Sequence, residues 1–141
     1  MASQTQISET PVGLGVLDEE HSEIQRRHLW LDRAILETGS LIRTRVAAEH
    51  LAEVILLHLL HEEEFLEKMS FPFLQEHRDT QLEMMAEIFK IELDLSRDDI
   101  SAAIRLRDLC LGWMHAHIHV ESRELEVAVL AGGNQLGSIR A

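Results

Sequence analysis

Histidines with the spacing of helix core positions occur in four separate segments of the chain: His21, His58, His77 and His117. A single histidine in an apolar stripe is usually a core residue with a satisfied hydrogen bond. Four such residues, one in each segment, indicate a shared site if they lie at similar heights in a packed core. Imidazole suits iron, manganese or zinc, so the set predicts a buried metal site.

Two glutamates extend this set with carboxylate ligands. Glu62 follows His58 by four residues, which places both side chains on one helix face about a turn apart. A buried glutamate without a partner is costly, and binding to a cation removes that cost. Glu121 follows His117 at the same spacing but belongs to an acidic cluster with Glu124. Helical spacing alone leaves open whether Glu121 is a metal ligand or a solvent-exposed side chain.

Apolar residues at alternating spacings of three and four place these side chains on helices. Pro72 suits the first turn of a helix, and Gly39 and the pair Gly132-Gly133 suit helix ends. Short joins between the segments predict an all-α, up-down-up-down four-helix bundle over residues 14–131. A flexible N-terminal arm at 1–13 and a flexible C-terminal tail at 132–141 are expected to flank it.

Composition narrows the classes of function. The chain has 141 residues, enough for one domain, and a formal charge of -12 that argues against nucleic-acid and anionic-membrane partners. Neither a membrane span nor a signal peptide is recognisable, so a cytoplasmic location is expected. Cys110, the only cysteine, excludes an intrachain disulfide and is expected to be a buried apolar residue. No nucleophile elbow or phosphate-binding glycine loop is present, and the oligomeric state is not indicated.

Taken together, these segments resemble the hemerythrin family in order and spacing. Residues 15–21, Gly-Val-Leu-Asp-Glu-Glu-His, are similar to the start of its first helix, and residues 58–63 to its histidine-aromatic-x-x-Glu-Glu segment. Phe71-Pro72 stands where the family has Tyr-Pro, with His77 at the family's interval after the proline. Residues 113–118, Trp-Met-His-Ala-His-Ile, resemble its Trp-Leu-x-x-His-Ile. The resemblance covers about residues 14–125.

This resemblance implies a pair of iron ions that binds O2 reversibly, for carriage, storage or sensing rather than catalysis. His21 and His58 would bind one iron, His77 and His117 the other, and Glu62 would bridge the two.

Two family ligands are replaced in this chain. Gln81 stands where the family has a second histidine on helix three, and Ser122 stands where it has a bridging aspartate. Glu121 is the candidate substitute for that aspartate. His28 also lies on a core stripe, but a position two turns beyond His21 favours a packed core residue over a ligand.

Three functions therefore remain open. They are a di-iron O2-binding protein, a single or altered metal site with redox activity, and a metal-free interaction module. Five retained ligand positions favour the first two, because a core that had lost its metal would be expected to replace buried charge by apolar residues.

Overall fold

The computed structural model describes residues 14–38 and 40–140, and its secondary structure is helical throughout. The elements are α2 (Leu14–Arg33), the π-helix η1 (Ala34–Thr38), α3 (Leu41–Lys68), α4 (Leu74–Ser96) and α5 (Ser101–Arg140). No strand occurs in this part of the chain, which confirms the all-α prediction. Within the same residues, none of the helices combines the length and the apolar character that crossing a membrane requires. The predicted arm at 1–13 lies outside the described residues.

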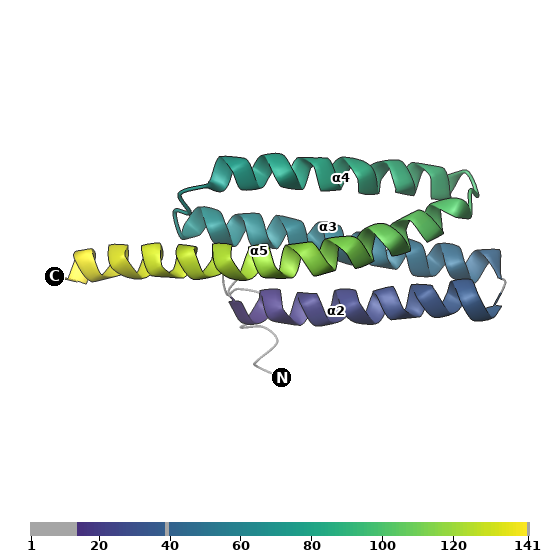
Figure 1. Cartoon of the computed structure of the whole chain (residues 1–141), viewed down its shortest axis with the longest axis horizontal. Helices are drawn as coiled ribbons and strands as arrows, with labels where there is room; N and C mark the ends of the chain where they lie inside the picture. Colours follow the sequence, from purple (N-terminus) through teal and green to yellow (C-terminus); the bar gives the residue numbers. More distant parts are fainter. Residues whose placement is uncertain (1–13, 39, 141) are drawn as a thin grey trace, which may run out of the picture.

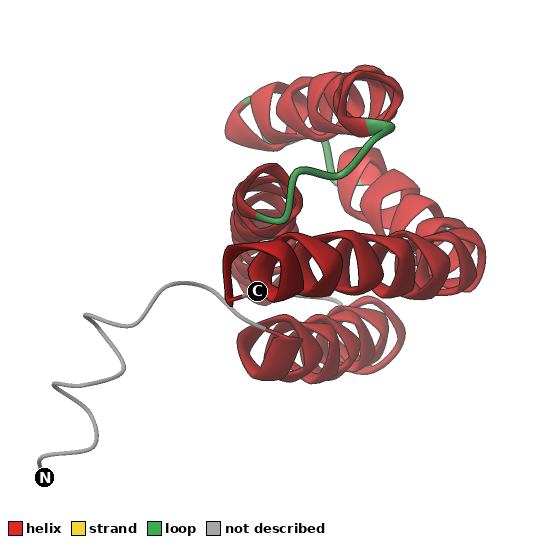
Figure 2. Ribbon diagram, turned by 90° about the vertical axis from the view of Figure 1, so that its left-hand side faces the viewer, coloured by secondary structure: helices red, strands yellow, loops and turns green. Residues whose placement is uncertain are grey.

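The four long helices lie side by side (Figure 1). Helix α3 packs against α2, α4 and α5, while α5 also packs against α2 and α4. The end-on view shows that short loops join the helices (Figure 2). This bundle-like packing brings side chains from distant parts of the sequence to one interior.

Local signals set the helix ends. The Ser40 side chain accepts a hydrogen bond from the backbone N–H of Arg43 at 3.3 Å and so caps α3. Ser70 and Asp98, with φ of 56° and 60°, occupy the left-handed region just after α3 and α4, where the chain leaves each helix. Pro72 lies in the turn before α4 and not in its first turn, a small correction to the sequence prediction.

Helix α5 is longer than predicted. The expected stop at Gly132-Gly133 is wrong, because α5 continues to Arg140. A glycine inside a helix costs about 1 kcal/mol relative to alanine but keeps its N–H donor, so it weakens a helix without ending it. Only proline removes that donor, and none follows Pro72. The C-terminal part of α5 extends past the other helices (Figure 1).

Two apolar clusters fill the interior, and the predicted site residues lie between them. One cluster contains Ile24, Ile55, Leu59 and Cys110, and burial raises the pKa of the Cys110 thiol to about 12, as expected for an inert core residue. The other cluster lies toward the opposite ends of the same helices and contains Leu17, Phe65, Leu66, Phe71, Leu125 and Ala128. Along α2, α3 and α5, the chain passes from one cluster through the predicted ligands to the other, which defines a polar layer between two apolar ones.

Candidate metal centre

The polar layer brings together all six predicted ligands, contributed by four helices. His58, Glu62 and Glu121 are fully buried, His77 is nearly so, and His21 and His117 are partly buried. Helical spacing of four puts the histidine and the glutamate of α3 on one face, and the same holds for the pair on α5. The helices therefore direct imidazoles and carboxylates from all sides toward one point.

Glu62 contacts histidines from three helices. Its Oε2 lies 2.9 Å from Nε2 of His117 and 3.4 Å from Nε2 of His58. Its other oxygen, Oε1, lies 3.2 Å from Nε2 of His77. One carboxylate thus spans the interior between α3, α4 and α5.

Glu121 contacts a second, overlapping set of histidines. Its Oε2 lies 2.6 Å from Nε2 of His21 and 2.9 Å from Nε2 of His117, and its Oε1 lies 3.3 Å from Nε2 of His58. The solvent-exposed alternative for Glu121 is therefore wrong. Ser122, at the position of the family's aspartate, is exposed.

The carboxylates in this layer favour the protonated forms of His58 and His117. Burial alone would lower the pKa of His58, but hydrogen bonds to carboxylates outweigh burial and raise this pKa to about 11. The same opposition, with carboxylates again dominant, raises the pKa of His117 to about 9. Burial would raise the pKa of Glu121, yet its histidine contacts hold that pKa well below the usual range. The protonated rings of His58 and His117 thus give the layer positive charge, as a bound metal ion would.

Four ligand atoms at the centre are buried and lack a hydrogen-bond partner among the described residues. They are Nε2 of His58, Oε1 of Glu62, Nε2 of His77 and Oε1 of Glu121. Buried polar atoms are nearly always paired, so their convergence needs an explanation. Cations bound near these atoms would satisfy them, and the donor set of imidazole and carboxylate suits iron, manganese or zinc.

The ligand atoms form two groups that could each hold an ion. One group contains His58, Glu62, His117 and Glu121, and the other contains Glu62, His77 and Glu124. Within each group the ligand atoms lie within 4.8 Å of one another. Glu62 belongs to both groups, which places the two candidate positions next to each other.

Outer carboxylates orient the histidine rings. Nδ1–H of His58 donates to Glu20 at 3.0 Å, and Nδ1–H of His77 donates to Glu124 at 2.9 Å. With Nδ1 occupied in this way, Nε2 of each ring faces the centre. Glu20 also hydrogen-bonds to His61, and the Trp113 ring stacks on the ring of His117 at 4.4 Å.

Glu20 and Glu124 were not predicted from the sequence as hydrogen-bond partners of the ligand histidines. Glu124 lies seven residues after His117 and so on the same helix face, a signal that the spacing carried. Glu20 contacts His58 across two helices, which no spacing within α2 reveals. His28 is half-buried, and its Nε2–H donates to the backbone carbonyl oxygen of Arg107 at 3.1 Å, which agrees with the prediction of a hydrogen-bonded histidine. Gln81 is buried, with 6% of its surface exposed, and lies one turn after His77.

Comparison of the chain with protein-family models, curated proteins and solved structures finds no match. The hemerythrin resemblance therefore rests on the sequence motifs, and the site is interpreted from its own geometry.

Proposed function

We propose that the chain is a hemerythrin-like, up-down-up-down four-helix bundle that binds two iron ions and, through them, O2. The observation that best supports this proposal is that two buried carboxylates, Glu62 and Glu121, each contact histidines assigned to both irons. Oε2 of Glu62 contacts His58 and His117, and its Oε1 contacts His77. Oε2 of Glu121 contacts His21 and His117, and its Oε1 contacts His58. A carboxylate that contacts imidazoles assigned to both irons is placed where a bridging ligand would lie.

In this proposal each side chain has a distinct task. His21 and His58 would hold one iron, His77 and His117 would hold the other, and the carboxylates of Glu62 and Glu121 would balance their charge. Bound iron would supply the electrons for reversible O2 binding. Glu20 and Glu124 fix the ring orientations of two ligands. The apolar clusters cover the layer on two sides.

The second candidate function is a single metal ion with redox activity. This candidate is supported by the different numbers of ligands in the two groups. The group that contains Glu121 offers four ligand residues, whereas the group that contains Glu124 offers only three. Gln81 offers a neutral amide where the family has an imidazole, which weakens the second position further. A metal-free interaction module has less support, because it leaves buried polar atoms without hydrogen bonds.

Metal content per chain separates these functions. The protein is loaded anaerobically with ferrous iron, freed of excess and analysed for iron, with manganese and zinc loaded in parallel. About two irons per chain support the proposal, as a bridged carboxylate site requires. One iron supports the second candidate, and no retained metal contradicts both. For the two-iron form, an absorption band that appears with O2 and disappears under vacuum would support reversible binding.

A further inference from the structure

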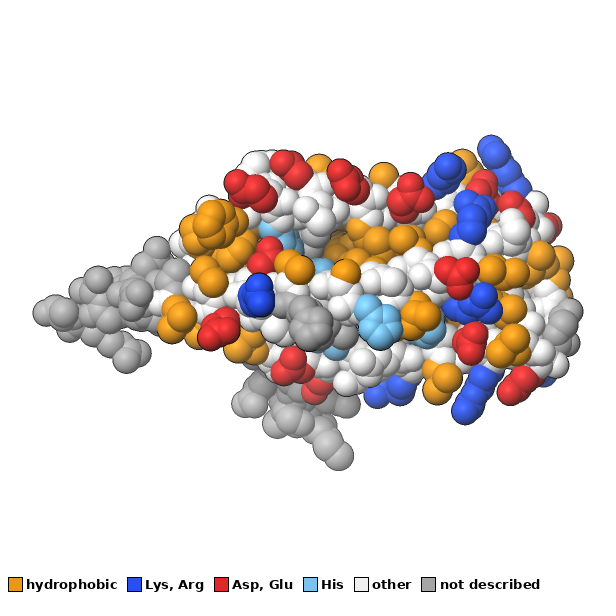
Figure 3. All heavy atoms as spheres, viewed as in Figure 1, with side chains coloured by type: hydrophobic (Ala, Val, Ile, Leu, Met, Phe, Trp, Pro, Cys, Tyr) orange, Lys and Arg blue, Asp and Glu red, His pale blue; other side chains and the backbone are white. Residues whose placement is uncertain are grey.

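A cavity of about 270 Å³ opens between α4 and α5, directly beside the candidate metal centre. Its inner wall is formed by buried Leu59, His77 and Gln81, and partly buried Trp113 lines it as well. The outer part is formed by exposed residues such as Val120. Hydrophobic and histidine side chains are visible between these two helices (Figure 3). An engineered apolar cavity of about 150 Å³ holds a benzene molecule, so this one has room for a larger ligand.

Gln81 gives the cavity a polar group with no protein partner. Its side chain is 6% exposed and lines the cavity. Its Nε2 donates a hydrogen bond to none of the described residues. A buried primary amide normally makes several hydrogen bonds, and leaving it unpaired is unfavourable. A ligand with a hydroxyl or carbonyl oxygen would supply the missing partner.

The remaining lining selects against charged ligands. The walls are mainly apolar, so an organic ion would lose much of its hydration there. Glu124, which also lines the cavity, already pairs with His77, and Glu76 lies at the exposed start of α4. An anion would in addition be repelled by both carboxylates. These properties define the ligand as neutral and mainly apolar, with one oxygen at its inner end.

We infer that this cavity binds a neutral, mainly apolar organic molecule, about as large as a substituted benzene ring, whose hydroxyl or carbonyl oxygen hydrogen-bonds to the Gln81 amide. The bound molecule lies beside His77 and His117, which line the same cavity. Its role as a substrate or effector of the metal centre rests on the proposed function, whereas the binding itself does not.

Four probes with one ring and one variable substituent test this inference: benzyl alcohol, toluene, benzylamine and benzoate. Binding is followed by the fluorescence of Trp113 in the full chain with Trp30→Phe, because Trp30 is the only other tryptophan and is 41% exposed. Benzyl alcohol should bind about tenfold more tightly than toluene, the effect of one hydrogen bond to an otherwise unpaired buried group. The two ions should bind more weakly than benzyl alcohol. Gln81→Leu should abolish the difference between benzyl alcohol and toluene.

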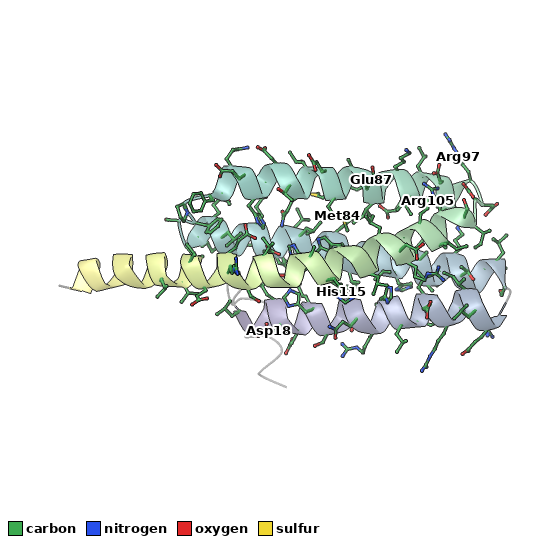
Figure 4. All side chains as sticks on the ribbon, viewed as in Figure 1. Asp18, Met84, Glu87, Arg97, Arg105 and His115 are labelled. Atoms are coloured by element: carbon green, nitrogen blue, oxygen red, sulfur yellow. The ribbon has the colours of Figure 1, made fainter. Side chains whose placement is uncertain are left out.

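A second variant tests the cavity without changing Gln81. Ala116 is exposed and lines the cavity, so Ala116→Phe should weaken benzyl alcohol binding at least about tenfold by occupying its volume. His115→Phe is the matched control, since His115 neighbours Ala116 but points to the side of α5 away from α4, whereas Met84 extends from α4 toward α5 (Figure 4). Thermal unfolding of each variant verifies that it is folded.

Each outcome decides the inference. The inference is overturned if the binding of benzyl alcohol does not saturate, or if benzylamine or benzoate binds more tightly than benzyl alcohol. It is also overturned if the preference for benzyl alcohol over toluene persists in Gln81→Leu, or if Ala116→Phe and His115→Phe bind benzyl alcohol equally well. All titrations are run with chelator and again after iron loading. Saturable binding in a chain that retains no iron would support the cavity and contradict the proposed function. Retained iron without probe binding would support the proposed function and contradict the inference about the cavity.

Discussion

Oε2 of Glu121 lies 2.6 Å from Nε2 of His21, although the two residues are 100 positions apart in the chain. This contact joins α2 to α5 within the buried layer. Under the proposed function, this contact lets Glu121 take the role that an aspartate at the position of Ser122 has in hemerythrins. Glutamate, one methylene longer than aspartate, reaches the centre from the preceding position, while Ser122 faces solvent.

Glu121→Gln should reduce retained iron from about two per chain to one or less, because it removes a negative charge and a bridging oxygen at constant size. Glu126→Gln, an exposed change on the same helix, is the matched control and should retain the full amount. Elemental analysis after identical loading measures both. Addition of Ser122→Asp to Glu121→Gln should not restore iron, since that side chain points outward. Equal iron in the Glu121 and Glu126 variants would remove Glu121 from the site.

The stability of the metal-free protein should fall as pH rises from neutral. The pKa values of His58 and His117, raised from 6.5 to about 11 and about 9, lie above those of the unfolded chain. The stabilisation by their protonated forms is therefore fully present below pH 6.5 and is lost as pH rises through 9 and toward 11. Thermal unfolding in chelator across this range measures the effect.

The controls for this pH dependence are two histidine variants. His117→Gln should flatten the decline between pH 6.5 and 9, whereas His50→Gln should leave it unchanged because His50 is exposed. Metal affinity should change in the opposite direction and increase with pH, since a metal must displace the same protons. A melting temperature that rises with pH in the chelated protein would contradict this description of the centre.

Gln81→His should raise iron affinity, because it offers an imidazole one turn from His77 at a buried position beside the centre. It should also weaken benzyl alcohol binding, since the amide is lost. Competition with a chromogenic ferrous chelator measures the first effect. Gln75→His, on the exposed face of α4, is the matched control. No gain over that control would indicate that the metal position lies out of reach of residue 81.

The two carboxylates that hydrogen-bond to ligand histidines should affect metal affinity, Glu20 from outside both groups and Glu124 from within the group of His77. Glu20→Gln and Glu124→Gln each remove a charged acceptor from Nδ1–H of a ligand histidine and should lower iron affinity about 10- to 100-fold. Glu19→Gln is the control for the first, because Glu19 is exposed. The same chelator competition applies. Variants that match this control would mean that packing alone orients His58 and His77.

Much of the site can be predicted from the sequence because polar residues at the apolar positions of a helix are easily recognised. His21, His58, Glu62, His77 and His117 are recognisable in this way, since polar side chains rarely occupy core positions without a partner. Glu121 is not, because its neighbours on α5 are also acidic and spacing does not reveal depth.

The features that the sequence did not reveal depend on contacts between helices. The pairing of Glu20 with His58 and the cavity beside Gln81 exist only once α2, α3, α4 and α5 are packed. The length of α5 was underestimated for a local reason, since two glycines weaken a helix without terminating it.

The distribution of the ligands along the chain sets an order for assembling the centre. During synthesis His21, His58, Glu62 and His77 leave the ribosome before His117 and Glu121, which lie on the last helix. Before α5 docks, Glu62 lacks its contact with His117 and the layer remains open to water on one side. A nascent chain can thus offer iron only a partial and exposed set of ligands. The closed centre forms only after α5 has been synthesised and has docked, so under the proposed function the docking of α5 completes the iron site.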